Sequence, residues 1–406
     1  MKTKWKKYIE SYGIIHGSFC FLKYLCISFF KVAVASSLNR IFGIKNIIVL
    51  KGQSDFEGNC RKLYDELIEA GLDKTYKIVW HIDNVENKSN LKNDHTVIIT
   101  NDNFFKSIYY NAVAKYVFFE VACCFKRRVK GQTIVYLSHG CPSIKNSLGL
   151  VTLNPKLVSY AVVTSESVSE KMAEIYEFPQ SKLIINGLLR NDAIFKDNIS
   201  FDVVDKTITN RVIIWMPTFR KTNIIVNNIS RSDSEEDYLF GLPLIKSMDD
   251  LEAINKKLIQ ENITLVIKPH PRAAECGIET INFSNIKVWT NEFLNTNGVN
   301  IYSLFHASSG MVTDYSSVSF DYLLADHPIA YVIDDINSYK LGFAYDNILE
   351  YMPGNHISNR EELFMFFEQV ARSQDLYYEK RHQINKWANK YQDGNNSQRM
   401  IKMLGM

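Results

Sequence analysis

The sequence predicts an α/β protein built from two doubly wound halves. Short β-branched or aromatic runs alternate with helical segments, which is typical of this class. The runs form two series, separated near residues 195–210 by the polar stretch FKDNISFDVVDKTITN. The chain has 406 residues, of which 46% are hydrophobic, so its length favours two domains with separate cores.

Residues 1–45 are expected to form a basic amphipathic helical segment that associates with a membrane. They contain eight Lys or Arg and one acidic residue, and they include the apolar stretch SFCFLKYLCISFFKVAVASSL. Lys23 and Lys31 interrupt this stretch, so it lacks the roughly 18 uninterrupted apolar residues of a transmembrane helix. A signal peptide fits poorly, because no small-residue cleavage site follows a short apolar core. The segment therefore suits an anionic membrane surface, and the alternative is a helix packed on the protein's own core.

The two series of runs predict an N-terminal domain over 46–200 and a C-terminal domain over 206–406. The first series is NIIVL, YKIVWHI, TVIIT, KYVFFE, TIVYLSHG and SYAVVTS. The second is RVIIWMP, ITLVIKPHP, IKVWT, GMVTD and PIAYVID, followed by helices over 360–403. Residues 222–238 are polar and acidic and are expected to form an exposed loop.

Composition and motifs argue against several classes of protein. The seven cysteines form no regular framework, which favours reduced thiols in the cytoplasm. Zinc-ligand spacing is absent, so no metal site is expected. Neither a Walker GxxxxGK[ST] nor a GxGxxG sequence occurs, so ATPase and dinucleotide-binding functions lack their motifs. Basic residues beyond the N-terminus are outweighed by acids, so nucleic acid is not an expected partner.

Polar residues gather where four of the predicted strands end. Ligands of doubly wound sheets bind beyond the carboxyl ends of the strands, so these residues are candidates for a site. Lys and Arg balance phosphate charge and loop amides hold phosphate oxygens, so the set suits a diphosphate. In chain order the candidates are His139 and Gly140; Thr218 and Arg220; Lys268, His270 and Arg272; and Thr313, Asp314, Ser316 and Ser317.

The turn in GMVTDYSSVSFDYLL joins an apolar strand to a helical pattern. Its hydroxyls and backbone N–H groups would lie at a helix N-terminus, where the dipole favours anions. Ser, Thr and Asp are also the usual helix N-cap residues. The turn is therefore interpreted as a phosphate cradle, with a simple helix cap as the alternative.

Five motifs, in this order, resemble the CDP-glycerol glycerophosphotransferase family: SHGCPSIK, WMPTFRK, IKPHPR, VTDYSSVSFDYLLADHPIAYV and GFAYD…PG. That family includes wall teichoic acid primases and polymerases, with relatives that use CDP-ribitol or build capsules. The resemblance runs from about Asn46 to about Leu363. It implies a GT-B-like enzyme whose two Rossmann-like domains, acceptor domain first and CDP-donor domain second, face an interdomain cleft. Cys141 and Leu341 replace a Thr and an Arg that are usual in the family.

The resemblance implies a site in which the family's two histidines fall on His139 and His270. The donor loop falls on Thr313, Asp314, Tyr315, Ser316 and Ser317, and donor contacts are also expected from Thr218, Arg220, Lys268 and Arg272. Acceptor contacts are expected from Gly140, Cys141, Pro142 and Lys145. Asp321, one helical turn after Ser317, either binds a donor hydroxyl or caps the helix.

The expected reaction moves glycerol phosphate or ribitol phosphate from CDP-glycerol or CDP-ribitol to a hydroxyl of a lipid-linked glycan. A neutral imidazole can accept the proton of the attacking hydroxyl near pH 7, and His139 is assigned that role. His270, Lys268, Arg272 and the Ser316–Ser317 turn would stabilise the departing CMP. The two histidines could exchange roles. No cofactor is required by this scheme, and a divalent cation has no support in the sequence.

Three other functions stay open at this point. They are a GT-B glycosyltransferase that uses a nucleotide sugar, a nonhydrolytic sugar-nucleotide epimerase, and a membrane scaffold that only binds the donor. The epimerase would not need the N-terminal segment, and the two histidines weigh against the scaffold. The expected location is peripheral, on the cytoplasmic face of the bacterial membrane.

Overall fold

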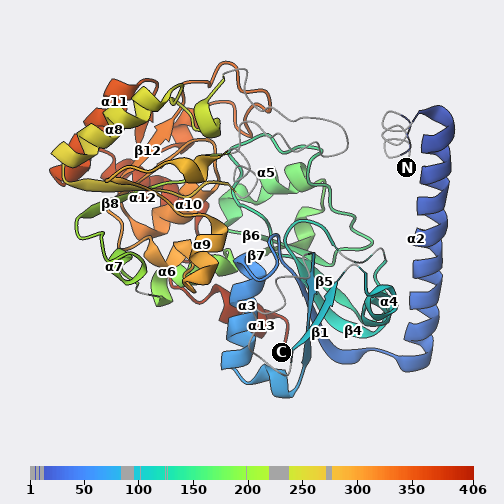
Figure 1. Cartoon of the computed structure of the whole chain (residues 1–406). Helices are drawn as coiled ribbons and strands as arrows, with labels where there is room; N and C mark the ends of the chain where they lie inside the picture. The colour runs from blue at the N-terminus through green and yellow to red at the C-terminus, as the bar shows by residue number, and fades with distance from the viewer. Residues whose placement is uncertain are drawn as a thin grey trace.

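Each series of apolar runs folds into its own parallel sheet in the computed structural model (Figure 1). The structure describes residues 5, 9, 13–83, 96–100, 102–123, 125, 127–197, 199–218, 237–270 and 277–406. The α/β class and the two doubly wound halves are therefore confirmed. The loop expected over 222–238 lies almost wholly outside the described residues.

The first sheet has seven parallel strands in the order β3-β2-β1-β4-β5-β6-β7. Alternate residues of β1 point into different cores: Val49 packs with Val117 on one face, and Leu50 packs with Phe118 on the other. Both faces are buried, which explains why the strand reads as one continuous apolar run. The strands are β1 Lys45–Lys51, β2 Lys77–Ile82, β3 Val97–Thr100, β4 Ala114–Phe119, β5 Thr133–Tyr136, β6 Tyr160–Val163 and β7 Leu183–Ile185.

The second sheet has six parallel strands in the order β10-β9-β8-β11-β12-β13. Its strand order reverses between β8 and β11, as the first sheet's does between β1 and β4, and ligands of such sheets bind at these switch points. The strands are β8 Arg211–Trp215, β9 Ile263–Ile267, β10 Ile286–Val288, β11 Gly310–Thr313, β12 Ile329–Val332 and β13 Asn355–Ile357. The apolar runs in the sequence did not predict β7 and β13, which have only three residues each.

Helices cover both faces of each sheet (Figure 1). Those of the first half are α3 Gly58–Glu69, α4 Phe104–Val113, α5 Glu166–Tyr176 and α6 Asp192–Lys196. Those that follow are α7 Phe201–Val204, α8 Met248–Gln260, α9 Asn291–Thr296, α10 Val318–Tyr322, α11 Arg360–Ala371, α12 Tyr378–Ala388 and α13 Asn396–Met403.

The last helix, α13, returns to the first half of the chain. Met400 and Ile401 are buried in the core that also holds Leu50 and Phe118. Asp192 accepts hydrogen bonds from the backbone N–H groups of Asn396 and Ser397, both at 2.8 Å, and so caps the helix. The division at residues 200–206 stays a prediction, and the first sheet draws part of its cover from the end of the chain.

The N-terminal segment forms one long helix, α2 (Ile14–Phe42), that stands beside the body of the protein (Figure 1). Its 29 residues span about 43 Å. An 18-residue window has mean hydropathy 1.6 and is almost wholly exposed, so the helix is long and apolar enough to cross a membrane. Its apolar side chains wind around the axis rather than gather on one face. The expected helix is present, but its apolar residues do not gather on one face as an amphipathic helix requires. Whether the segment lies on a membrane or crosses it stays a prediction.

The end of α2 is fixed to α4. Ala35 is buried, the Asn39 side-chain amide donates to the carbonyl of Ala112 at 2.9 Å, and Phe42 meets the ring of Tyr109 edge-on. The first part of the helix carries exposed apolar side chains such as Phe19. The helix is therefore docked at one end and largely uncovered along the rest of its length.

Two loops join the halves directly. Lys145 and Phe343 form an antiparallel bridge, and the Ala344 N–H donates to the Ile144 carbonyl at 2.8 Å. A Cβ atom on Gly140 would lie 2.1 Å from the Ser317 hydroxyl oxygen and 3.0 Å from Ser317 Cβ. Glycine at position 140 thus permits the loop after β5 to touch the turn after β11.

This contact predicts that Gly140→Ala and Ser317→Ala are not additive. The added methyl group should lower the free energy of unfolding by about 1–3 kcal/mol, as overpacking usually does. In the Ser317→Ala background the penalty should shrink, because the clashing oxygen is gone, although the Cβ atoms remain close. A double-mutant cycle by urea unfolding measures the difference. Equal penalties in both backgrounds would mean that the two loops do not touch in solution.

Candidate functional site

The end of β8 and the end of β11 are tied together by Asp314. Its carboxylate accepts from the Thr218 backbone N–H at 3.0 Å and from the Thr218 hydroxyl at 2.9 Å. The Thr313 hydroxyl donates to the Met216 carbonyl at 2.8 Å. Thr313 and Asp314 are fully buried. They therefore support the backbone at the switch point of the second sheet.

Ser316 and Ser317 are half-buried at the surface of that switch point. The helix they begin is shorter than the sequence pattern indicates, because α10 ends at Tyr322 and a 3-10 turn, Leu323–Ala325, follows it. The Ser316 hydroxyl lies 3.4 Å from the Val318 N–H, and Ser317 makes no capping hydrogen bond. A short helix gives a weak dipole, so hydroxyls and loop amides are the main anion donors here.

Lys268 and His270 follow β9 at the same edge of the sheet. The Lys268 ammonium is buried and donates to the Pro269 carbonyl at 3.1 Å. Burial lowers the pKa of Lys268 to about 8, and the nearby Glu57 carboxylate opposes that shift. A buried, poorly solvated cation at a strand end is suited to a phosphate that would complete its solvation. His270 is half-buried beside it.

Glu57, which the sequence did not reveal, connects the first half to the second. It precedes α3, and its carboxylate accepts from the side-chain amides of Asn291 and Asn295 on α9, both at 2.9 Å. Burial raises the pKa of Glu57. The residue thus places a carboxyl group from one half near the buried Lys268 of the other.

The loop after β5 carries His139 to the surface. His139 is exposed, and its backbone N–H donates to the Tyr136 hydroxyl at 3.3 Å. The preceding residue, Ser138, is fully buried and has a φ of 67°, a conformation that few non-glycine residues adopt. The local backbone is therefore specified by its surroundings rather than by its own preference.

The predicted acceptor residues lie in this same loop but differ in exposure. Cys141 and Pro142 are buried, and the Cys141 sulfur lies 3.5 Å from the Thr164 hydroxyl. Burial raises the pKa of the Cys141 thiol to about 12. Gly140 and Lys145 are half-buried where the loop meets the second half. Arg220 and Arg272, which were predicted to bind the donor, lie outside the described residues.

Asp321 lies at the boundary between the halves, with its carboxylate fully buried. Arg190 pairs with it at 2.7 Å, and the Asn191 amide and the Tyr302 hydroxyl each donate to it at 2.9 Å. Three protein side chains therefore already bond to the Asp321 carboxylate. Sequence reasoning missed Arg190, Asn191 and Tyr302, although Arg190 follows the short strand β7 and so occupies a further strand end.

Glu120 lies at the switch point of the first sheet, where the strand order reverses between β1 and β4. It follows β4, and its carboxylate accepts from the Cys60 N–H at the start of α3 at 2.8 Å. A Cβ on Gly58, whose φ is 72°, would lie 2.5 Å from Glu120 Oε2. Burial raises the pKa of Glu120 to about 7. A helix start at a switch point commonly receives phosphate, and here the chain's own carboxyl group occupies it.

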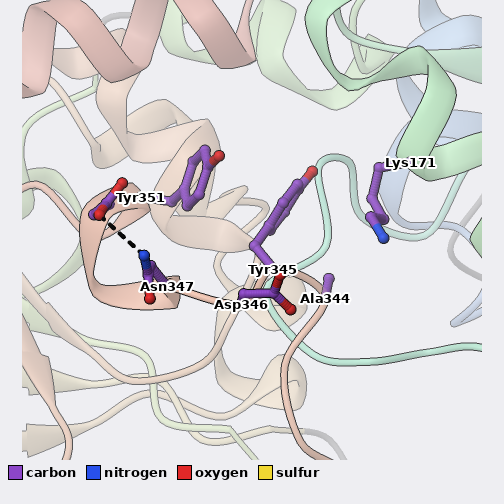
Figure 2. Close-up of a pocket in the computed structure, with 7 residues that line it drawn as sticks. Lys171, Ala344, Tyr345, Asp346, Asn347 and Tyr351 are labelled. Carbon is purple, nitrogen blue, oxygen red and sulfur yellow. Dashed lines mark hydrogen bonds between the residues drawn. The ribbon is translucent and has the colours of Figure 1, made fainter.

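A pocket opens beside the bridged loops (Figure 2). Its volume is about 260 Å³, and the rings of Tyr345 and Tyr351 stack in its wall with centroids 4.5 Å apart. It adjoins the loop after His139 through Ala344. Its lining residues are Lys171, Ala344, Tyr345, Asp346, Asn347, Glu350 and Tyr351. Among the described residues, no cluster of three His, Cys, Asp or Glu side chains is arranged to hold a metal ion.

Known proteins are similar to this chain in sequence and in fold. A teichoic acid poly(glycerol phosphate) polymerase of Bacillus spizizenii is 25% identical over 78% of this chain and 82% of its own length. A teichoic acid glycerol-phosphate primase of Bacillus subtilis is 24% identical over 60% of this chain and 57% of its own. The solved wall teichoic acid polymerase TagF superposes with a TM-score of 0.73 at 16% identity, covering 100% of this chain and 98% of that one.

The family assignment rests on nearly the whole chain rather than on the five motifs alone. The model of the CDP-glycerol:poly(glycerophosphate) glycerophosphotransferases matches residues 36–405. The matched region begins within α2 and extends through α13, so it includes both sheets and every predicted site residue. This chain belongs to the CDP-glycerol:poly(glycerophosphate) glycerophosphotransferase family.

Proposed function

We propose that this chain transfers glycerol phosphate, or another polyol phosphate such as ribitol phosphate, from a CDP-activated donor to a hydroxyl of a membrane-linked glycan or polymer. The observation that carries the proposal is the contact of Gly140 with Ser317. It brings the exposed His139 of the first half to the half-buried serine turn of the second. A base for one substrate and an anion site for the other thus lie at one junction.

In the proposed reaction an acceptor hydroxyl attacks the β-phosphorus of the CDP-polyol. The new bond joins the acceptor oxygen to phosphorus, the bond from phosphorus to the bridging oxygen breaks, and CMP leaves with that oxygen. His139 accepts the hydroxyl proton. Lys268, His270 and the Ser316–Ser317 turn balance the charge that develops on CMP. The Glu120 carboxyl group already occupies the start of α3, which supports placing the donor in the second half.

We also propose that α2 holds the enzyme at the cytoplasmic side of the membrane, where a lipid-linked acceptor would be presented. The helix is exposed and apolar along most of its length. Its fixed end packs on α4 of the first half, the half that carries His139. The half of the protein that carries His139, the proposed base, would thereby be the half attached to the membrane.

His139→Ala and His270→Ala should each lower CMP release by about 10²–10⁴-fold, the usual effect of losing an acid–base group. Purified full-length protein is incubated with CDP-glycerol or CDP-ribitol and a membrane lipid extract, and CMP is quantified. His382→Ala is the matched control, since His382 is half-buried like His270 and pairs with Asp326, away from the candidate site residues. Turnover of UDP-sugars in place of CDP-polyols would identify a glycosyltransferase. Donor binding without CMP release would identify a scaffold.

Donor affinity should fall as pH rises through about 8, the pKa of Lys268. Below that pH the ammonium is charged and attracts the diphosphate; above it the charge is lost, so the dissociation constant should rise by up to about tenfold between pH 7 and pH 9. Calorimetric titration with CDP-glycerol measures this. Lys268→Arg should give a flat profile, because arginine stays charged. A flat wild-type profile would remove Lys268 from donor binding.

Deleting residues 1–30 should release the protein from vesicles that contain anionic lipid, while the docked end of α2 keeps its contacts with α4. High salt should release little of the full-length protein, because burial of apolar side chains is not screened as surface charge is. Sedimentation of both proteins at low and high salt tests this. Equal sedimentation of the truncated protein would place the anchor elsewhere, and its unfolding would make α2 part of the core.

A further inference from the structure

A single guanidinium group connects the loop of His139 to α10, the helix that follows the Ser316–Ser317 turn. Arg190 lies in the 3-10 turn Leu189–Asn191 after β7, and its side chain is only 10% exposed. Its Nη1 donates to the backbone carbonyl of His139 at 2.8 Å, and its Nη2 donates to Asp321 Oδ2 at 2.7 Å. One partner belongs to the first half and the other to the second.

We propose that Arg190 is a positioning residue that holds His139 in register with the Ser316–Ser317 turn. This inference rests on the proposed function, in which His139 and that turn serve opposite substrates. Arg190 need not touch either substrate, because it acts through the backbone of His139 and the carboxylate of Asp321.

On the first side, the backbone around His139 is held at two successive carbonyls. Arg190 bonds to the carbonyl of His139, and the Asn59 amide donates to the carbonyl of Ser138 at 3.0 Å. Asn59 also accepts from the Arg190 backbone N–H at 3.0 Å. The positive φ of Ser138 persists where such surroundings dictate it. Losing the Arg190 side chain would remove one of these two carbonyl hydrogen bonds.

On the second side, Asp321 lies in α10, four residues after Ser317. Its carboxylate is 1% exposed, and the Asn191 amide and the Tyr302 hydroxyl bond to it besides Arg190. Arg190 also lies over the ring of Tyr302, 5.3 Å from its centroid. These contacts fix the start of α10, and with it the turn, relative to the base of the His139 loop.

The planar fork of arginine suits this geometry better than lysine does. Two guanidinium nitrogens point in fixed, different directions and can bond to one acceptor in a loop and another in a helix. A lysine ammonium at position 190 would keep the charge opposite Asp321 but present one compact donor group. Arg190→Lys therefore removes the bridge while it retains the ion pair's charges.

Arg381 offers a matched control. It is also buried, with its side chain 1% exposed, and it also bridges two carboxylates, Asp326 and Asp375. Both partners lie in the second half and neither is a predicted site residue. Arg381→Lys should lower thermal stability without a specific effect on turnover, which is the behaviour expected of a merely structural arginine.

The test compares Arg190→Lys with Arg381→Lys in full-length protein. Arg190→Lys should lower kcat by about 10²-fold, because a misplacement of about 1 Å can have that effect. The dissociation constant for CDP-glycerol should change less than about threefold, since donor groups remain in place. Unchanged kcat per folded molecule would overturn the proposal. A loss of donor affinity that accounts for the whole effect would overturn it as well.

Hydrogen exchange separates this inference from the proposed function, because it needs no turnover. Amide protection should fall by on the order of tenfold in both 138–142 and 316–320 in Arg190→Lys, and in neither segment in Arg381→Lys. If Arg190→Lys fails to fold, Asp321→Asn provides the same comparison and should loosen the same segments. Unchanged protection in both segments would overturn the positioning role even if the enzyme used another donor. Absence of CMP release from the wild type, with the exchange result intact, would reject the proposed function alone.

Discussion

All the candidate residues depend on one constraint: every strand in both sheets is parallel. Parallel strands end at the same edge, so polar residues that are scattered along the sequence from His139 to Ser317 meet at two edges. The loops that leave the two edges are in contact. The 2.1 Å spacing that a Cβ on Gly140 would have from the Ser317 oxygen shows how little room separates them.

The sequence could predict the sheets because their strands are buried on both faces and read as uninterrupted apolar runs. It could also predict the strand ends, since polar residues follow those runs directly. It could not predict Asp321 as the partner of Arg190, which lies 131 residues away. Periodicity reports whether a residue faces a core, but not which distant group it meets. The same limit hid the partners of Glu57. Glu120 directly follows the run KYVFF and could have been noticed as a strand end, but its sequence does not show that it meets the start of α3.

The N-terminal helix and α10 differ from expectation for two separate reasons. In α2, Lys23 and Lys31 interrupt the apolar stretch, yet the apolar residues around them surround the helix axis and are numerous enough, by length and composition, for a spanning helix. In α10, Phe320, Leu323 and Leu324 satisfy a helical pattern, yet the α-helical hydrogen bonding ends at Tyr322. Apolar spacing constrains which side chains are buried and leaves the length of the helix to tertiary contacts.

The return of α13 to the first sheet affects how the two halves are joined. The chain crosses between them twice, once after α6 and again between α12 and α13. The second crossing is fixed to the first half, since the Lys390 N–H donates to the Thr164 carbonyl at 3.0 Å and the Ser165 hydroxyl donates to the Trp387 carbonyl at 2.6 Å. The halves are therefore covalently joined at two places, and the second crossing is held by hydrogen bonds to the loop that follows β6. A cut in the chain near residues 198–200 would leave the halves still linked through the second crossing.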